Sequence, residues 1–243
     1  MSLNPFSDLT HAEFRAAYTG GKRTSAGRLP APPAPESAAA NPTSVDWRTK
    51  GAVTPVKDQG QCGSCWAFAT TVATEGSTYL GSNSTKLISL SEEQILACDT
   101  KDGNAACNGG DQLPAMQWLM TVPGQCSEAD YPYSSGGGNS PKTCKTTCAP
   151  AAVITAAFEV PKEDQTALET AIAGRPISLS VDASSNAWQN YGGGVCECPG
   201  ALASKGVFLR TLSHSSCTLS PLSATLYTLS HRHWLLRLQE GLL

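Results

Sequence analysis

The pattern of apolar and polar positions differs between the two halves of the chain. Residues 41 to about 130 contain helix-like stretches and loops, whereas 151–160 and 177–181 have the composition of β-strands. The second of these segments alternates with the period of two that is typical of a half-buried strand. Between them, 162–173 predicts a helix that a glycine ends. Helices followed by strands indicate an α+β fold of two lobes.

Three helices are predicted in the first half of the chain. One covers 66–73. A second covers 92–97, because Ser91 and Gln94 have the spacing of a capping box, which opens a helix. A third and shorter helix covers 112–120. The chain shows no internal repeat that would indicate a repeat architecture.

Composition divides the chain into three parts. A stretch rich in Ala, Pro and Ser, 24–42, runs from residues 1–40 into the start of the next part and indicates an exposed linker. Residues 41–195 carry the predicted elements and form the candidate domain. Residues 196–243 repeat Ser, Leu and Thr without a clear period. We interpret them as an aberrant segment that replaces the native end of the domain.

Charge and hydropathy give no support for two classes of partner. The net charge of −3 provides no electrostatic basis for binding nucleic acid or an anionic membrane. No run of about 18 apolar residues is present, so no segment is expected to span a bilayer. We therefore expect neither nucleic acid nor membrane as a partner.

Cysteine content points to an oxidising compartment. The chain has ten cysteines and a glycosylation sequon at Asn83. Such features are typical of secreted or lysosomal proteins, yet residues 1–6 lack the apolar core of a signal peptide. We expect the N-terminus of this chain to be truncated or wrongly assigned.

The segment 59–66 carries the candidate chemistry. It reads Gln-Gly-Gln-Cys-Gly-Ser-Cys-Trp, with Cys65 at the start of a predicted helix. A helix N-terminus favours an anion, and the thiolate is the nucleophilic form of cysteine. Attack on a peptide carbonyl creates an oxyanion, for which the amide of Gln59 and the backbone N–H of Cys65 can serve as donors. The alternatives are a buried or disulfide-bonded cysteine and a thioredoxin-like redox pair, which would require a preceding parallel strand.

These residues resemble the papain family of cysteine proteases. The run Cys-Gly-Ser-Cys-Trp at 62–66 is the signature around the family's nucleophile. Residues 4–14 are similar to the end of the family's inhibitory propeptide. Tyr-Pro-Tyr at 131–133, together with 181–185 and 191–195, most closely resembles the trypanosomatid cathepsin L-like branch. The resemblance covers about residues 4–195.

The resemblance implies a fold, an activity and partners. The fold would be papain-like, with the cleft between a helical lobe and a β-barrel lobe. The activity would be endopeptidase cleavage through a thioester on Cys65, with Gln59 in the oxyanion hole. Protein or peptide substrates, inhibition by the chain's own propeptide, a monomer and no cofactor are expected. The compartment would be lysosome-like or extracellular.

Further residues are assigned to the substrate cleft by the same resemblance. Gly109 and Gly110 belong to a loop along which an extended peptide lies. Ser64 and Trp66 would also border the substrate. Asp111 and Ser180 would make the specificity pocket polar, although Asp111 can equally point to solvent. 

The resemblance also implies disulfide pairings. Cys62 would pair with Cys107, and Cys98 with Cys144 or instead with Cys148. Cys126 would take whichever of these two is left. The pairing of the three later cysteines stays open: these are Cys196, Cys198 and Cys217. No metal site is expected, because the cysteine clusters have no regular pairing with histidine.

The general base is the part of the family pattern that this chain lacks. Lys205 stands where a histidine followed by Gly-Val is expected, and no asparagine follows Asn190. The free pKa of lysine is about 10.4, which makes it a poor base near neutral pH. His214 is the first candidate replacement, ahead of His231 or His233. His11 lies in the propeptide-like part and is not expected to be catalytic.

Two further functions follow from this gap. The chain is alternatively an inactive homologue, or a frameshifted product with an incomplete barrel lobe, that retains at most peptide binding. A non-enzymatic inhibitory or binding module is the other alternative.

Overall fold

The computed structural model describes most of the chain before residue 181. The described residues are 6–18, 21–22, 29–32, 41–141, 143–145, 147–162, 164–180, 189–190, 196–197 and 218–219. Most of the tail assigned above to an aberrant segment, including His214, lies outside them.

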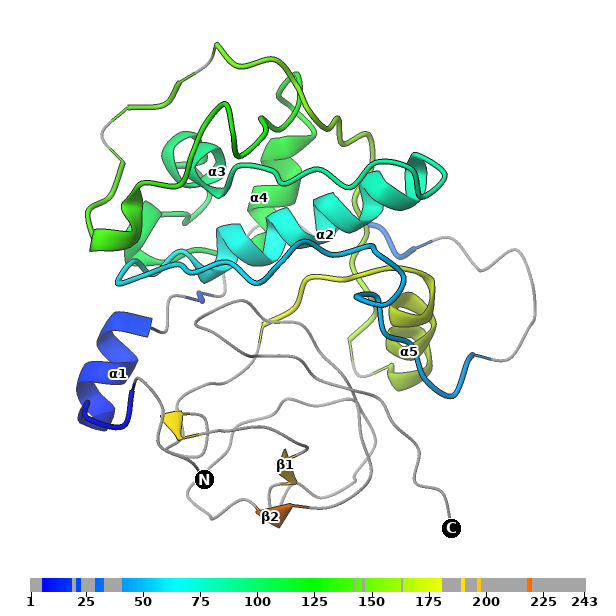
Figure 1. Ribbon diagram of the computed structural model, residues 1–243, viewed down its shortest axis with the longest axis horizontal. Coiled ribbons are helices and arrows are strands. Elements are labelled where there is room, and N and C mark those ends of the chain that lie inside the picture. The colour runs from blue at the N-terminus through cyan, green and yellow to red at the C-terminus, as the bar shows by residue number, and fades with distance from the viewer. Residues whose placement is uncertain are drawn as a thin grey trace.

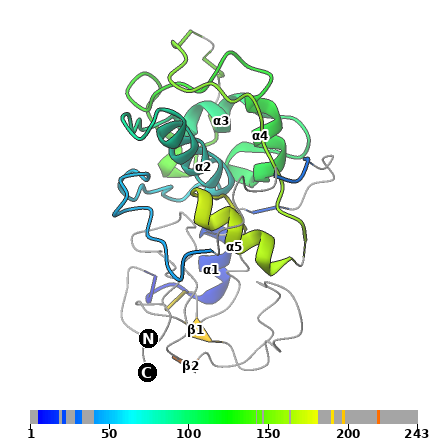
Figure 2. The same ribbon diagram turned by 90° about the vertical axis from the view of Figure 1, so that its right-hand side faces the viewer.

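Three helices form one group in the upper part of the molecule (Figure 1). They are α2 (Cys65–Gly81), α3 (Glu92–Cys98) and α4 (Gln112–Leu119). α1 (His11–Tyr18) lies apart from this group. α5 (Gln165–Gly174) lies beside the C-terminal half of α2 (Figures 1 and 2). Two 3₁₀ turns, η1 (Ala106–Asn108) and η2 (Ser135–Gly137), complete the helical elements of the described residues.

The central helix α2 is buried on all sides over its first three turns. Every residue from Trp66 to Gly76 is buried. Two threonines in this stretch satisfy their hydroxyls inside the helix: Thr70 donates to the Trp66 carbonyl at 2.9 Å and Thr74 to the Thr70 carbonyl at 3.0 Å. The helix therefore continues well past the predicted end at residue 73. No helix in the described residues is long and apolar enough to cross a bilayer.

The core joins the three grouped helices. Its fully buried members include Trp66 of α2, Ile95 and Leu96 of α3, and Leu119 of α4. Burial of such side chains stabilises a fold by about 1.5–3 kcal/mol each. This core therefore fixes the N-terminal end of α2, where Cys65 lies.

Helix α3 starts where the sequence predicts, with half of the expected capping box. The Ser91 hydroxyl accepts a hydrogen bond from the Gln94 backbone N–H at 3.0 Å. The Gln94 side chain does not return to Ser91. It accepts from the Cys126 N–H at 2.7 Å and donates to the Gly124 carbonyl at 3.2 Å. Tertiary partners thus replace the local one.

Helix α5 confirms the helix predicted at 162–173. It starts after Asp164, whose carboxylate accepts from the Ala167 N–H at 2.8 Å. The indole N–H of Trp47 donates to the Ile172 carbonyl at 2.8 Å. A Cβ on Gly76 of α2 would lie 2.6 Å from Pro176, so the glycine permits this close approach.

The two predicted strands are not assigned as strands in the described residues. In 151–160 only Ala152 pairs, in an isolated bridge with Gln125, and 177–180 has no ladder. A strand is defined by its hydrogen-bonded partner. The strands that are assigned, β1 (Cys196–Glu197) and β2 (Thr218–Leu219), pair antiparallel.

Candidate active site

Cys65 is the first residue of the buried helix α2. Its side chain is a half-buried thiol, outside the disulfides. Ser64 occupies the N-cap position, but its hydroxyl does not accept from the helix, and the first turn contains no acidic residue. Because no side chain caps this end, the helix dipole there favours negative charge on the Cys65 sulfur.

Gln59 is buried directly beside this cysteine-containing loop. Only 1% of its surface is exposed, and its Nε2 donates to the Cys62 carbonyl at 2.7 Å. The reverse amide orientation would place two carbonyl oxygens together, so this bond fixes the orientation of the side chain. A primary amide has two N–H groups. One N–H therefore holds the loop, and the second is not used by this bond.

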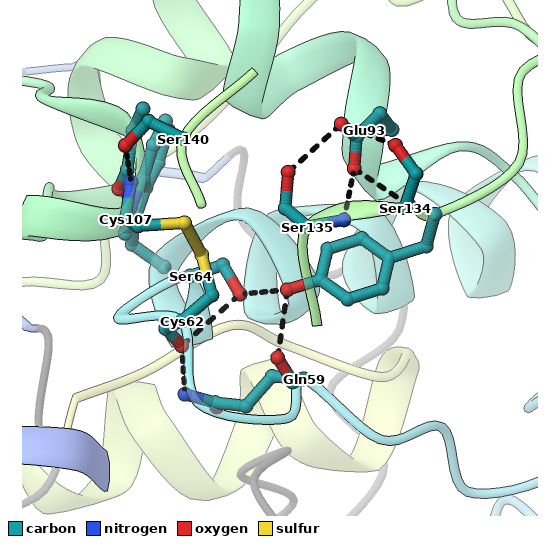
Figure 3. The surroundings of a disulfide bond; sticks show 11 residues. Gln59, Cys62, Ser64, Glu93, Cys107, Ser134, Ser135 and Ser140 are labelled. Atoms are coloured by element: carbon teal, nitrogen blue, oxygen red, sulfur yellow. Dashed lines mark hydrogen bonds between the residues drawn. A yellow bond between two sulfur atoms is a disulfide. The ribbon is translucent and has the colours of Figure 1, made fainter. Parts of the chain in front are cut away.

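A disulfide anchors the loop that carries Gln59 and Cys65. Cys62 pairs with Cys107, as the resemblance implied. The Gly63 N–H also donates to the Cys107 carbonyl at 3.0 Å. Figure 3 shows this bridge, with Cys107 held from its other side by Ser140 and with Gln59 and Ser64 next to Cys62. The loop 59–64 and the loop 107–110 are therefore held together by a disulfide and a backbone hydrogen bond.

The two other disulfides of the described residues settle the open pairings around them. Cys98 pairs with Cys144 and not with Cys148. Cys126 pairs with Cys148, which is the partner that remained. Each bridge typically stabilises a fold by about 2–4 kcal/mol. 

The glycine pair expected in the substrate cleft lies against Trp66. A Cβ on Gly110 would lie 2.7 Å from the Trp66 ring and 2.4 Å from Asn104 Oδ1. The neighbouring Gly109 has φ +94°, a conformation that favours glycine. Neither glycine has a side chain of its own to cover the backbone at this point. The Gly110 carbonyl accepts a hydrogen bond from the Lys22 N–H at 2.7 Å.

The two residues expected to make the pocket polar have partners in the structure. Asp111 is the N-cap of α4 and accepts from the Leu113 N–H at 3.3 Å, a role that the sequence analysis did not assign. The Ser180 hydroxyl donates to Gln112 Oε1 at 3.0 Å. The structure therefore joins Ser180 to Gln112 of α4, next to Asp111.

The N-terminal segment, defined here as residues 6–18 and 21–22, contacts Gln189. The buried amide of Gln189 donates to the carbonyls of Phe6 at 2.9 Å and Leu9 at 2.7 Å. Its Oε1 lies 3.2 Å from His11 Nδ1. One glutamine thus holds the turn that precedes α1.

Among the described residues, the one histidine is His11, and it belongs to this contact. The candidate base His214 lies outside them, as do His231, His233 and Lys205. The structure therefore places the Gln59 side chain on Cys62, in the loop that leads to Cys65, whereas the base remains a prediction.

A tyrosine that sequence reasoning did not assign to the site connects its parts. The Tyr133 hydroxyl donates to the Gln59 backbone carbonyl at 2.8 Å and lies 2.8 Å from Ser64 Oγ. Its ring packs edge-on against Phe68 of α2, with centroids 4.9 Å apart. The only signal in the sequence was the Tyr-Pro-Tyr motif.

A buried cluster of charged side chains joins α2 and α3. Lys57 Nζ contacts Glu75 Oε1 at 2.8 Å, Glu92 Oε1 at 2.7 Å and the Leu90 carbonyl at 3.1 Å. Both glutamate side chains are fully buried. Glu75 also accepts from the Thr54 hydroxyl at 2.7 Å. One lysine therefore serves two buried carboxylates.

The ionisation of this cluster is set by burial. Burial raises the pKa of Glu92 to about 8, although the Lys57 charge opposes the shift. Burial lowers the pKa of Lys57, but the carboxylates of Glu92 and Glu75 outweigh it, and the net shift is upward. Burial also raises the pKa of Glu128, and the Tyr133 N–H and the Lys57 charge oppose this shift. 

Comparison with known proteins decides the family. The model of the papain family cysteine protease matches residues 41–212. The chain belongs to this family. The match extends past Val195, into the segment that the sequence analysis set apart. 

The curated relatives of this papain-family chain include plant proteases. Vignain from Ricinus communis is 43% identical over 203 residues, which cover 80% of this chain and 54% of vignain. The senescence-specific cysteine protease SAG12 from Arabidopsis thaliana is 41% identical over 80% of this chain and 57% of its own length. The chain thus spans about half the length of the curated relatives it matches.

Solved structures of proforms share the papain-like fold of two lobes. The recombinant stem bromelain precursor is 37% identical, with a TM-score of 0.68 over 80% of this chain and 60% of its own. The proform of the ragweed pollen allergen Amb a 11 is 34% identical, with a TM-score of 0.69 over 82% of this chain and 62% of its own.

The expected affinity to the trypanosomatid branch is not supported, because the relatives named above are plant proteases. Two of the residues that suggested it have structural roles. Tyr133 holds Gln59 and Ser64, and Tyr131 donates to the Thr143 carbonyl at 3.2 Å. Such roles suit any member with this fold, so the motif does not distinguish branches.

Proposed function

We propose that this chain acts as a cysteine endopeptidase, with Cys65 as the nucleophile and Gln59 as an oxyanion donor. The observation that carries the proposal is the thiol of Cys65 at the start of α2, directly after a loop in which the buried amide of Gln59 binds the Cys62 carbonyl. The Cys62–Cys107 disulfide holds both on one loop. The names of the relatives, which are proteases, support the same class of reaction.

The reaction follows from these positions. The Cys65 thiolate attacks the substrate carbonyl and forms a C–S bond, while the carbonyl electron pair moves to oxygen, toward Gln59. The carbon–nitrogen bond then breaks, and the amine leaves with a proton from the general acid, for which His214 is our candidate. Water hydrolyses the thioester and returns Cys65. No cofactor takes part in this scheme.

We further propose that the N-terminal segment is the inhibitory propeptide. Gly21 forms a parallel bridge with Gly110, and Lys22 donates to the Gly110 carbonyl. An extended substrate would use the same backbone edge through main-chain hydrogen bonds. Protein or peptide substrates would therefore compete with this segment. We expect the processed protein to be a monomer.

The expected compartment is lysosome-like or extracellular, and a glycan would accompany it. Three disulfides in the described residues support an oxidising route of synthesis. Asn83 of the sequon is exposed at φ +56°, in the loop directly after α2. A glycan there would extend into solvent from an exposed side chain.

Expression through a secretory pathway tests the glycan. We expect an intact-mass increase that is removed by a glycosidase and is absent from Asn83→Gln and from Thr85→Ala. The Thr85 variant keeps the asparagine but destroys the sequon. An unmodified wild-type protein of secretory origin would contradict the assignment.

Covalent labelling tests the proposed enzyme. The inhibitor E-64 is bound in a solved structure of a Carica candamarcensis cysteine protease that is 38% identical to this chain. We expect E-64 to label Cys65, faster in a chain from which residues 1–40 have been removed than in the intact chain. Cys65→Ala should abolish both the adduct and peptide hydrolysis, and His214→Ala should abolish hydrolysis.

The contrary results are distinct. No adduct on the processed chain would refute the activated thiol. An adduct on Cys65 without hydrolysis would refute the endopeptidase and favour the alternative, an inactive homologue that retains at most peptide binding. Hydrolysis that survives His214→Ala would refute only the base.

A further inference from the structure

The N-cap serine of α2 does not cap its helix. Serine at this position normally accepts a hydrogen bond from the N–H of the second or third helical residue. Ser64 makes no such bond, and its φ of −97° and ψ of 9° differ from the extended conformation of a capping residue. Its hydroxyl is fully buried and faces Tyr133 Oη at 2.8 Å.

The direction of the hydrogen bonds between these hydroxyls is determined by counting hydrogens. Each hydroxyl has one hydrogen. Tyr133 donates its hydrogen to the Gln59 carbonyl, so Ser64 donates to Tyr133. The Cys62 carbonyl lies farther from Ser64, at 3.4 Å, and receives the Gln59 side chain instead at 2.7 Å. The result is a directed chain from Ser64 through Tyr133 to Gln59.

The surroundings of Tyr133 keep it in this state. Burial raises the pKa of its hydroxyl, the bond to Ser64 opposes the shift, and the carboxylates of Glu93, Glu92 and Asp58 add to it. The hydroxyl is therefore a permanent donor. The Tyr133 N–H donates to Glu128 Oε1 at 2.8 Å, which fixes the backbone.

We propose that Tyr133 is a positioning residue for the nucleophile: its hydroxyl draws Ser64 away from the end of α2 and ties Gln59 to the same point. Without it, the Ser64 backbone relaxes toward the extended conformation of a capping residue, and the hydroxyl then accepts one of the N–H groups that otherwise stabilise a thiolate on Cys65. The Gln59 carbonyl also loses its donor, which loosens the oxyanion loop. This inference rests on the proposed function, because it concerns the reactivity of Cys65.

The test compares Tyr133→Phe with wild type in the full chain. The phenyl ring keeps the packing on Phe68, so only the hydroxyl is lost. The thiolate of Cys65 is titrated by its ultraviolet absorbance, as a difference against Cys65→Ala, and its alkylation by iodoacetamide is timed. We expect the titration to move to higher pH and the alkylation rate at acidic pH to fall about fivefold to tenfold, the effect of one lost hydrogen bond.

Two further variants separate positioning from general loosening. Tyr131→Phe is the matched control, since its hydroxyl contacts Thr143 and Lys145 and not the site; it should leave the titration unchanged. Ser64→Ala added to Tyr133→Phe should restore the titration toward wild type, because no hydroxyl remains to cap the helix.

Each result decides the inference. An unchanged titration in Tyr133→Phe overturns it, as does an equal shift in Tyr131→Phe or a failure of Ser64→Ala to restore the titration. The thiolate titration does not require turnover, so a chain that fails to hydrolyse peptides refutes the proposed function and still reports on Tyr133.

Discussion

Replacing Lys57 with methionine is expected to lower the free energy of unfolding by about 3–5 kcal/mol at pH 8. The lysine is the shared partner of Glu75 and Glu92, whose side chains are fully buried. Its removal leaves two carboxylates without their opposite charge in a medium that solvates them poorly. Breaking a buried pair from one side costs more than the pair contributes.

The loss should depend on pH in a definite direction. Burial raises the pKa of Glu92 from 4.5 to about 8, so the folded state binds this proton more tightly than the unfolded state. The stability from this group is complete below pH 4.5 and is lost as the pH rises through 8. In Lys57→Met the carboxyl can stay protonated at acid pH. We therefore expect a smaller loss at pH 4.5 than at pH 8.

Urea unfolding at the two pH values measures this, with the disulfides intact. Lys86→Met is the matched control, since Lys86 is exposed, and it should change stability by less than about 0.5 kcal/mol. Glu92→Gln should flatten the dependence on pH in the wild-type background. An equal loss of unfolding free energy at both pH values in Lys57→Met would contradict the raised pKa of the buried Glu92.

Replacing Gly60 with alanine is expected to destabilise the protein by about 2–4 kcal/mol and to reduce labelling of Cys65. Gly60 has φ +61°, which a residue with a Cβ adopts at a cost of about 1–2 kcal/mol. The added Cβ would also lie 2.0 Å from the Gly136 carbonyl oxygen. That carbonyl accepts from the Gln61 N–H at 2.8 Å, so the clash pushes apart two backbones and moves Gln59.

Thermal unfolding and the E-64 rate measure the two effects. Gly137→Ala is the control in the facing loop, because no atom lies within 4 Å of its added Cβ. It should retain wild-type stability within about 0.5 kcal/mol. If Gly60→Ala unfolds and labels like Gly137→Ala, the close packing of the two loops is refuted.

Elements with local signals were predictable from the sequence. The helices α3 and α5 begin directly after Ser91 and Asp164. Both are N-cap residues, whose side chains accept a backbone N–H of the first turn. Asp111 gives the same signal directly before α4, and this role was open to prediction. The strands were not predictable in the same way, because a strand needs a partner far along the chain.

The same distinction applies to the candidate site. Cys65 and Gln59 lie on one short loop, so a contiguous motif identifies them. Tyr133 reaches Gln59 across 74 residues and Lys57 reaches Glu92 across 35. Contacts over such separations depend on how the helices pack, and no period or cap in the sequence predicts them.

The hydrogen bonds that hold the N-terminal segment are made largely to its main chain. Gln189 binds the carbonyls of Phe6 and Leu9, and Gly110 binds the N–H of Lys22. Backbone groups are the same whatever side chains accompany them. Substitutions of the exposed side chains of this segment are therefore expected to leave these hydrogen bonds in place. Its aromatic side chains pack on one another, so they shape the segment itself and do not make these bonds.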